Sequence, residues 1–207
     1  MLPGETVVAT LSPPDDKLSH VIAGSKALSE LISDFRCFTR VFVETLDLYT
    51  WGKSTWNNPP KDGLIKTAVW GQIWTITLYQ WYENVAYLAS KGVLRGERFN
   101  TKQQNKWWVW SSRYWMAYIA LEAVRLARVW QLKPTVTSSD DSAATKAETQ
   151  AAEALWKRQM TVNLAWAPVS YHYSLESGAL SNDWLGVLGL IAGATGFRNL
   201  WKQAGEA

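Results

Sequence analysis

The chain of 207 residues contains a single cysteine, Cys37, and only two histidines, His20 and His172. One cysteine excludes an internal disulfide bond, and it cannot supply the paired thiolates of a structural zinc site. Neither histidine has a cysteine or a second histidine at ligand spacing, so the sequence predicts no metal site and no cofactor. Cys37 is expected to pack as a small apolar side chain.

Sequence signatures of catalysis are missing as well. The chain has no G-x-S-x-G elbow, no P-loop and no dinucleotide-binding glycine fingerprint. Two glutamates in aromatic-rich stretches, Glu83 and Glu122, are the candidates for carboxylates with a perturbed pKa. Buried, paired glutamates are more often structural than catalytic. We therefore predict no catalytic residue and no enzymatic activity.

A long hydrophobic run is also lacking. The uncharged stretch between Lys66 and Glu83 has sixteen residues, which cover ~24 Å as a helix against a hydrocarbon core of ~30 Å. It includes Gln72 and Gln80, so an interfacial or re-entrant position fits it better than a crossing of the membrane.

An excess of charge is absent too, because the net charge is only +3. Residues 1–133 hold 16 Lys and Arg against 11 Asp and Glu, and the remainder holds 5 against 7. This balance is compatible with anionic lipid but too weak for a nucleic-acid-binding domain. The segment from Met1 to Lys17 is Pro-rich and acidic, so we expect no secretory signal peptide.

What the chain has in abundance is tryptophan, with fourteen residues. Trp is enriched at membrane–water interfaces, where its ring lies among apolar groups while its N–H stays hydrated. A large aromatic core is the other interpretation of this composition.

An amphipathic helix is indicated from Lys26 to Trp51. Seven apolar residues recur at steps of three or four, which places them on one helical face. This apolar stripe consists of Leu28, Leu31, Phe35, Phe38, Phe42, Leu46 and Tyr49. Polar residues fall between them, with Arg36 and Arg40 among these, and make the opposite face polar and partly basic. Such a helix either lies in a membrane surface or packs its stripe into the core of a bundle.

The stretch from Trp184 to Phe197 is the most apolar part of the chain, without a charge over fourteen residues. Small residues line one side of it and form a glycine ridge of Gly186, Gly189, Gly193 and Gly196. Each glycine weakens a helix in water by ~1 kcal/mol, whereas in a membrane glycines permit close helix–helix approach. We expect a membrane-inserted segment, although fourteen residues span only ~21 Å. A buried bundle helix is the alternative.

The remaining signals divide residues 1–133. Residues 1–16 are Pro-rich without periodicity and predict a disordered tail. Residues 17–133 predict a region of three amphipathic or interfacial helices, at about 17–53, 63–90 and 107–133. Asp62 is a plausible N-cap of the second helix, Gly92 a plausible stop, and residues 95–106 a polar connector.

The second half of the chain is less regular. Residues 134–150 predict a flexible linker, with a nascent helix from Ser142 onward. Residues 151–207 predict the C-terminal helices with the Gly-rich membrane segment. Pro168 is expected to end the first of these, a loop follows at 171–182, and Asp183 caps the last helix. The predicted fold class is all-α, a membrane-associated array of about four or five mostly antiparallel helices.

Four blocks of sequence carry a family resemblance. The first is D-F-R-C-F-T-R at 34–40, with Y-T-W-G some ten residues on, and the second is E-N-V-A-Y-L-A-S-K-G-V-L at 83–94. The third is K-W-W-V-W-S-S-R-Y-W at 106–115, running into L-E-A-V-R-L at 121–126, and the fourth is D-W-L-G-V-L-G-L-I-A-G at 183–193. In their order, from about Ser25 to Trp201, they resemble the peroxin-11 family, and most closely its fungal C-type branch. Residues 134–150 and the first twenty residues match nothing in the family.

The resemblance implies a protein of the peroxisomal membrane that elongates and remodels it before division, with peroxisome proliferation as the result. It also implies self-association and recruitment of a tail-anchored fission adaptor with a dynamin-related GTPase. The apolar stripe would then insert into an anionic bilayer, Arg36 and Arg40 would contact lipid phosphate, and the glycine ridge would be the homo-oligomer contact.

Two alternative functions stay open at this point. One is a membrane channel for small metabolites, also proposed for the family, with Gln72, Gln80, Glu83 and Asn84 facing the lumen. The other is a soluble helical binding module with a Trp-lined pocket.

Overall fold

A computed structural model of the chain describes residues 16–133 and 143–205. Every regular element in these two ranges is a helix, so the predicted all-α class is confirmed. The predicted tail lies outside the described residues up to position 15, and so does the predicted linker from 134 to 142.

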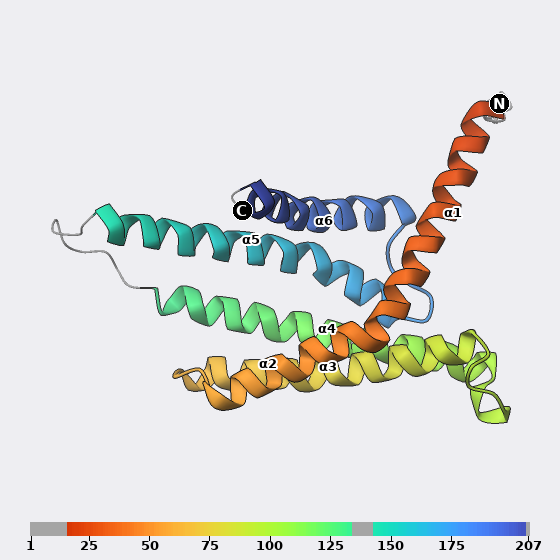
Figure 1. Ribbon diagram of the computed structural model, residues 1–207, viewed down its shortest axis with the longest axis horizontal. Coiled ribbons are helices and arrows are strands. Elements are labelled where there is room, and N and C mark those ends of the chain that lie inside the picture. Colours follow the sequence, from red (N-terminus) through yellow and green to blue (C-terminus); the bar gives the residue numbers. More distant parts are fainter. Residues whose placement is uncertain (1–15, 134–142, 206–207) are drawn as a thin grey trace, which may run out of the picture.

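The first rod of the array is a long bent helix. It consists of α1 (Asp16–Thr39), the π-helical segment η1 (Arg40–Glu44) and α2 (Thr45–Asn57), which follow one another without a break. We call this rod the leading helix. It ends shortly before Pro59 and Pro60, which cannot continue a helix. Its direction changes between α1 and α2 (Figure 1).

The second rod, α3 (Gly63–Ser90), has the predicted ends. The Asp62 side chain accepts a hydrogen bond from the Ile65 backbone N–H at 3.0 Å, which is the geometry of an N-cap. After the helix, Gly92 takes a positive φ of 72°, which favours glycine and stops the helix.

The third rod, α4 (Thr101–Gln131), begins six residues before the predicted start at Trp107. Asn100 is the reason, because its side chain accepts a hydrogen bond from the Gln103 backbone N–H at 3.0 Å and caps the helix. The predicted polar connector is therefore shorter than 95–106, and it contains one 3₁₀ turn, η2 (Glu97–Phe99).

The fourth rod, α5 (Ala143–Ser174), runs through Pro168, so the prediction that this proline ends the helix is wrong. A proline inside a helix costs ~3 kcal/mol through a lost hydrogen bond and a ring clash. Ala165 and Val169, which flank it, are buried, and this packing keeps the helix intact. The helix also begins within the segment predicted as a linker, close to the nascent-helix signal at Ser142.

The last rod, α6 (Asn182–Gly205), follows a tight loop at 175–181. The Nδ1 atom of His172 accepts hydrogen bonds from the backbone N–H groups of Ala179 and Leu180, both at 2.9 Å. Gly178 has a φ of 68°, and a Cβ atom there would collide with the His172 ring. His172 therefore organises the loop.

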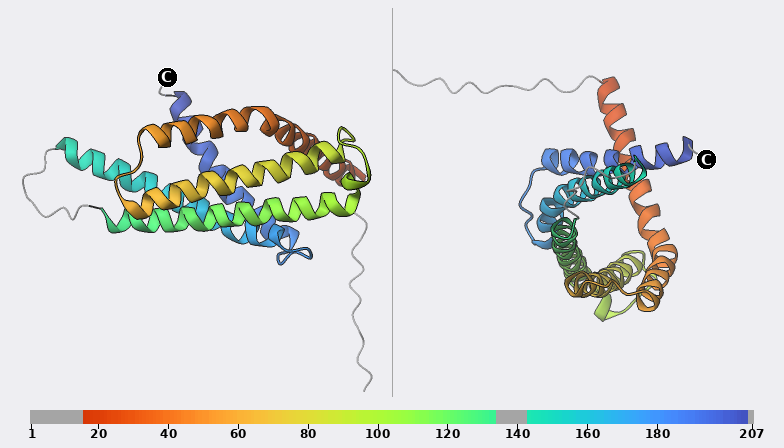
Figure 2. Two further views of the ribbon diagram at one scale, coloured as in Figure 1. Left: turned by 90° about the horizontal axis from the view of Figure 1, so that it is seen from below. Right: turned by 90° about the vertical axis from the view of Figure 1, so that its left-hand side faces the viewer.

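These rods form a curved layer that is one helix thick. Each packs on its neighbour in the chain, the leading helix on α3, α3 on α4, α4 on α5 and α5 on α6, and successive rods run mostly antiparallel (Figures 1 and 2). The predicted arrangement of about four or five mostly antiparallel helices is confirmed, whereas its association with a membrane stays a prediction. Because the described helices form no second layer, every rod keeps uncovered faces, and large apolar side chains are exposed on all of them.

The interior is concentrated between α3 and α4. Gln72, which is buried, donates to the Glu122 carboxylate at 2.8 Å, and Arg125 holds the same carboxylate through two bonds of 2.6 and 2.7 Å. A Cβ atom on Gly71 would lie 2.9 Å from Leu121 Cδ1, so a glycine lets the two helices approach closely. Glu122 is thus paired with Arg125, and its role here is structural.

Candidate functional site

The apolar stripe of the leading helix lies on the side turned away from the other helices. Its seven side chains are between 53% and 68% exposed, and they are Leu28, Leu31, Phe35, Phe38, Phe42, Leu46 and Tyr49. The Phe38 and Phe42 rings contact each other edge to face, with centroids 5.7 Å apart. A contiguous apolar surface of this kind is typical of a binding site for another molecule or a membrane. The bundle-core interpretation is wrong within the described chain, since no other helix covers the stripe.

The polar face of the leading helix makes the contact with α3 instead. Contacts that join the two rods include Asp34 with Lys91, Arg40 with Glu83, and Trp56 with Trp70. The first is an ion pair of 2.5 Å, and the last is an edge-to-face ring contact with a centroid distance of 6.1 Å. Thr55, on the same face, is buried. An ordinary core-facing helix shows the reverse orientation, with its apolar side inward.

Arg40 is the centre of this contact. Its Nη1 atom donates to both Glu83 carboxylate oxygens, at 2.7 and 2.9 Å, and to the Tyr79 hydroxyl at 2.5 Å. Its Nε atom pairs with Glu44 at 3.3 Å, and the Tyr79 hydroxyl donates to Glu83 at 2.8 Å. The four side chains form one partly buried network.

The protonation states of the network follow from its geometry. Burial on its own would lower the pKa of Arg40, but the Tyr79 and Glu83 oxygens outweigh it and raise that pKa, so the guanidinium stays charged. Burial raises the pKa of Tyr79, and the Glu83 carboxylate adds to this rise. The hydroxyl therefore stays protonated and donates its hydrogen bond to Glu83.

This network corrects the lipid-phosphate contact predicted for Arg40. The Arg40 side chain is only 16% exposed and is occupied by Glu83, Tyr79 and Glu44, so it is a structural cation of the helix contact. Arg36, one turn earlier, is exposed and forms no ion pair within the described residues. Of these two arginines, only Arg36 keeps an exposed side chain that could contact a lipid headgroup.

The π-helical segment lies at the same place as the network. Residues Arg40–Glu44 form a widened turn, and the Thr45 hydroxyl donates to the Val41 carbonyl at 3.1 Å within it. Such segments bend helices and often occur at functional sites. The bend therefore falls where the leading helix is fastened, and much of α1 extends beyond the array (Figure 1).

The glycine ridge of α6 faces open space. Among the described residues, no atom beyond the chain neighbours and the local helix backbone lies within 4 Å of a Cβ built on Gly186, Gly189, Gly193 or Gly196. Ala192, which is buried, lies on the side that meets α5, whereas Trp184, Leu190 and Phe197 are exposed. The α5 contact does not use the ridge, which stays open to a second helix.

The polar residues that a channel would place in its lumen are mostly engaged inside the array. Gln72 and Gln80 are buried, and Gln72 is bound to Glu122. Glu83 is held by Arg40. Asn84 is the exception, because its Oδ1 atom is buried and accepts no hydrogen bond from the part of the chain that the structure describes.

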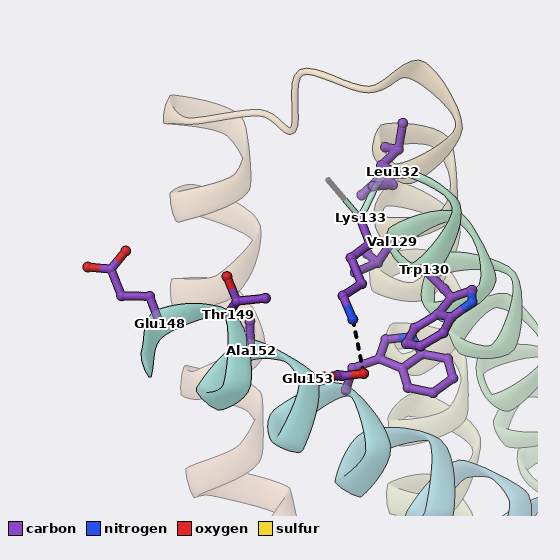
Figure 3. Close-up of a pocket in the computed structure, with 10 residues that line it drawn as sticks. Val129, Trp130, Leu132, Lys133, Glu148, Thr149, Ala152 and Glu153 are labelled. Atoms are coloured by element: carbon purple, nitrogen blue, oxygen red, sulfur yellow. Dashed lines mark ion pairs between the residues drawn. The ribbon is translucent and has the colours of Figure 1, made fainter. Parts of the chain in front are cut away.

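A tryptophan-lined pocket does exist, between the end of α4 and the beginning of α5 (Figure 3). It has a volume of about 500 Å³ and a mainly apolar lining. Trp130 and Trp156 pack together in its wall with ring centroids 4.5 Å apart, and Lys133 pairs with Glu153 at 2.9 Å across it. This is the feature that the soluble binding-module hypothesis required.

Two classes of site find no candidate in residues 16–133 and 143–205. No group of three His, Cys, Asp or Glu side chains there could hold a metal ion. None of the helices in these ranges has the combination of length and apolarity that spanning a bilayer requires. The predicted segment from Trp184 to Phe197 is thus not long and apolar enough to be a crossing.

Sequence reasoning missed several residues of the helix contact. Asp34, Tyr79 and Lys91 form it together with Arg40 and Glu83, and they lie up to 57 positions apart in the chain. The sequence does contain one sign of this contact, because Asp34, Cys37 and Arg40 recur at steps of three and form a polar face of the leading helix. Which distant residues this face meets is decided by packing, which periodicity does not report.

Comparison with known proteins gives one family. The family model of peroxisomal biogenesis factor 11 (PEX11) matches residues 15–201, which is almost the entire chain and includes the leading helix, the hairpin of α3 and α4, and α6. No curated protein gives a match, and no solved structure does. The chain belongs to the peroxisomal biogenesis factor 11 (PEX11) family.

Proposed function

We propose that this protein promotes elongation and remodelling of the peroxisomal membrane by inserting the apolar stripe of its leading helix into one leaflet. Membership of the family makes the chain a peroxisome biogenesis factor. The mechanism is supported by one observation, that the leading helix contacts the array with its polar face and leaves its apolar face exposed.

The energetics of insertion favour this orientation. Full burial of one phenylalanine side chain contributes ~2 kcal/mol, and the stripe holds three phenylalanines and four other apolar residues. Arg36 adds ~1 kcal/mol at an anionic surface. A helix wedged into one leaflet expands that leaflet relative to the other, and the membrane responds by curving. The helix lies in the membrane surface and does not have to cross the bilayer.

Self-association is the second part of the proposal. The glycine ridge of Gly186, Gly189, Gly193 and Gly196 is exposed and flanked by large apolar side chains. Small residues at this spacing allow two helices to approach closely. A homo-oligomer formed through α6 would place several leading helices on one membrane patch, and their effects on curvature would add.

Membrane remodelling of this kind precedes fission. On the family pattern, we expect recruitment of a tail-anchored fission adaptor and a dynamin-related GTPase, without assigning the residues that bind them. The assignment to the fungal C-type branch rests on the four sequence blocks and stays a prediction.

The alternative functions receive less support. A channel needs polar side chains that face a lumen, whereas Gln72 and Glu83 are bound within the array. A soluble binding module has its pocket beside Trp130 and Trp156, but it gives no role to the exposed stripe.

The test is a comparison of two double variants in vesicle binding and tubulation. We expect Phe35→Asp with Phe38→Asp to abolish both activities, and the same pair to leave peroxisomes unelongated in cells. The matched control is Trp74→Asp with Trp81→Asp, two equally exposed aromatic residues on α3, which should leave both activities in place. Equal losses from the two pairs would mean that the leading helix is not the inserting element.

A further inference from the structure

Positive charge is concentrated in the turn between α3 and α4. Residues 91–106 contain five basic residues against one acidic residue, Glu97, and therefore carry +4, while the chain as a whole carries +3. All other residues together sum to −1. We call this segment the basic turn, and its cations are Lys91, Arg95, Arg98, Lys102 and Lys106.

Four of these cations are available to a ligand. Lys91 is paired with Asp34, whereas the other four are exposed and make no ion pair within the described residues. Arg95 donates only its Nε–H, to the Gly92 carbonyl at 2.8 Å. The acidic neighbours are Glu97, on the turn itself, and Glu176, which borders a shallow hollow with Lys102 and Lys106. Cations therefore outnumber carboxylates at this surface.

The backbone gives the basic turn a protruding apolar tip. Gly92 and Gly96 have φ angles of 72° and 117°, which favour glycine and fold the chain sharply. Between them, Val93 is 65% exposed. Behind the tip, Phe99 packs on Trp107 with ring centroids 5.7 Å apart. An exposed apolar side chain beside basic residues such as Arg95 suits the boundary between headgroups and acyl chains.

The basic turn also lies beside the leading helix. The pair between Lys91 and Asp34 joins the end of α3 to α1, and Asp34 directly precedes Phe35 of the apolar stripe. Figures 1 and 2 show that α1 leaves the array at the end where α3 turns into α4. A surface that meets this part of the stripe is therefore close to the turn.

We propose that the basic turn binds the phosphate groups of anionic lipid headgroups and fixes how the leading helix meets the membrane. This inference rests on the proposed insertion of the stripe. Arg40 is held by Glu83 and is not available to lipid phosphate. The exposed cations of the basic turn take this electrostatic role instead, and they are Arg95, Arg98, Lys102 and Lys106. The stripe supplies apolar binding on any bilayer, and the turn supplies selectivity for an anionic one.

The experiment measures partitioning of the full-length protein onto two kinds of vesicle, phosphatidylcholine alone and phosphatidylcholine with phosphatidylserine. Each cation near an anionic surface changes the partition coefficient roughly fivefold. We expect the variant with Arg95, Arg98, Lys102 and Lys106 all changed to Gln to lose at least about tenfold on the anionic vesicles. On neutral vesicles it should equal the wild type, and its binding should depend less on salt.

The matched control removes the same charge elsewhere. Lys53, Lys61, Lys66 and Lys157 are exposed, and their joint change to Gln should leave anionic binding within about threefold of the wild type, since none lies in the turn. A second variant, Arg95→Lys with Arg98→Lys, keeps the charge and should also bind like the wild type.

Three results would overturn the inference. In the first, the turn variant binds anionic vesicles as well as the wild type. In the second, the control variant loses as much binding to anionic vesicles as the turn variant. In the third, the turn variant loses as much binding to neutral vesicles as to anionic ones. The first result would indicate that the basic turn binds an acidic protein partner and not a lipid. Failure of the proposed function looks different, because Phe35→Asp with Phe38→Asp would then bind as well as the wild type while the turn variant still lost anionic binding.

Discussion

The leading helix and the hairpin of α3 and α4 are both amphipathic, but they turn opposite faces toward the array. In the hairpin, Val69, Ile73 and Leu126 are buried between the helices, together with a bonded polar group at Gln72. In the leading helix, charged side chains such as Asp34 and Arg40 point inward, and the apolar stripe points outward.

The difference shows where each region obtains its stability. The hairpin is stabilised by apolar burial within the chain, which contributes ~25 cal/mol for each Å² removed from water. The leading helix is fastened at a few points, and isolated helices of its kind are marginal in water. Its apolar face can be buried only by something outside the described array. We therefore expect a stable hairpin that carries a loosely held membrane-binding helix.

The largest expected effect on stability separates the two regions directly. Leu126 is fully buried, so Leu126→Ala should lower the free energy of unfolding by ~2–5 kcal/mol. Phe42→Ala, at an exposed position of the stripe, should change it by less than ~0.5 kcal/mol. Denaturant unfolding of the two variants provides the measurement. A large loss for Phe42→Ala would show that the stripe is packed in solution.

The next effect concerns the fastening point. Arg40→Glu places a carboxylate against Glu83 and should loosen the leading helix by roughly 2 kcal/mol, because the pair is only partly buried. Hydrogen exchange should rise in α1 and α2 and stay unchanged in α3 and α4. The double variant Arg40→Glu with Glu83→Arg should restore protection. Exchange that rises uniformly over the chain would contradict local fastening.

A smaller effect is expected from acid. The hydrogen bond from Lys91 holds the pKa of Asp34 below its ordinary value near 3.8. A depressed pKa means that this pair stabilises the contact above the ordinary value, and that the contribution is lost as the pH falls through the lowered one. Protection of α1 should therefore decline below about pH 4, and Asp34→Asn should reduce this decline. If α1 of Asp34→Asn lost protection with falling pH as the wild type does, Asp34 would not be the group that causes the decline.

The smallest effect on folding is expected in α6. A Cβ atom added at Gly189 or Gly193 meets no neighbouring atom of the described residues, so we expect Gly189→Leu with Gly193→Leu to leave the stability of the folded chain nearly unchanged. The added side chains should separate two α6 helices and weaken crosslinked oligomers on membranes. Wild-type oligomer levels would show that the ridge is not the contact.

Much of the fold could be predicted from local signals. The cap at Asp62, the stop at Gly92 and the periodicity of residues 26–51 depend on neighbouring residues and were confirmed by the structure. The predicted end at Pro168 failed because burial of Ala165 and Val169 outweighs the local cost of proline. The predicted start of α4 at Trp107 is six residues too late, because the helix is capped at Asn100, ahead of the apolar run.

The candidate site was predictable only in part. The composition of the apolar stripe was visible in the sequence, but the direction in which it faces was not, since periodicity describes a bundle helix and a surface helix equally well. Arg40 was assigned to lipid because its partners, Tyr79 and Glu83, are about forty positions away. The charge of the basic turn is plain in the composition of residues 91–106, and the structure adds its exposure and its place beside α1.

The orientation of the leading helix on a membrane is the central claim, and a fluorophore scan measures it most directly. Single cysteines in a Cys37→Ser background would carry an environment-sensitive label at Leu31, Phe35 and Phe42 on the apolar stripe, and at Val41 and Thr55 on the inward face. On addition of anionic vesicles, we expect blue-shifted emission at the three stripe positions and none at the two inward positions. A shift at the inward positions, or no shift at the stripe, would contradict the claim.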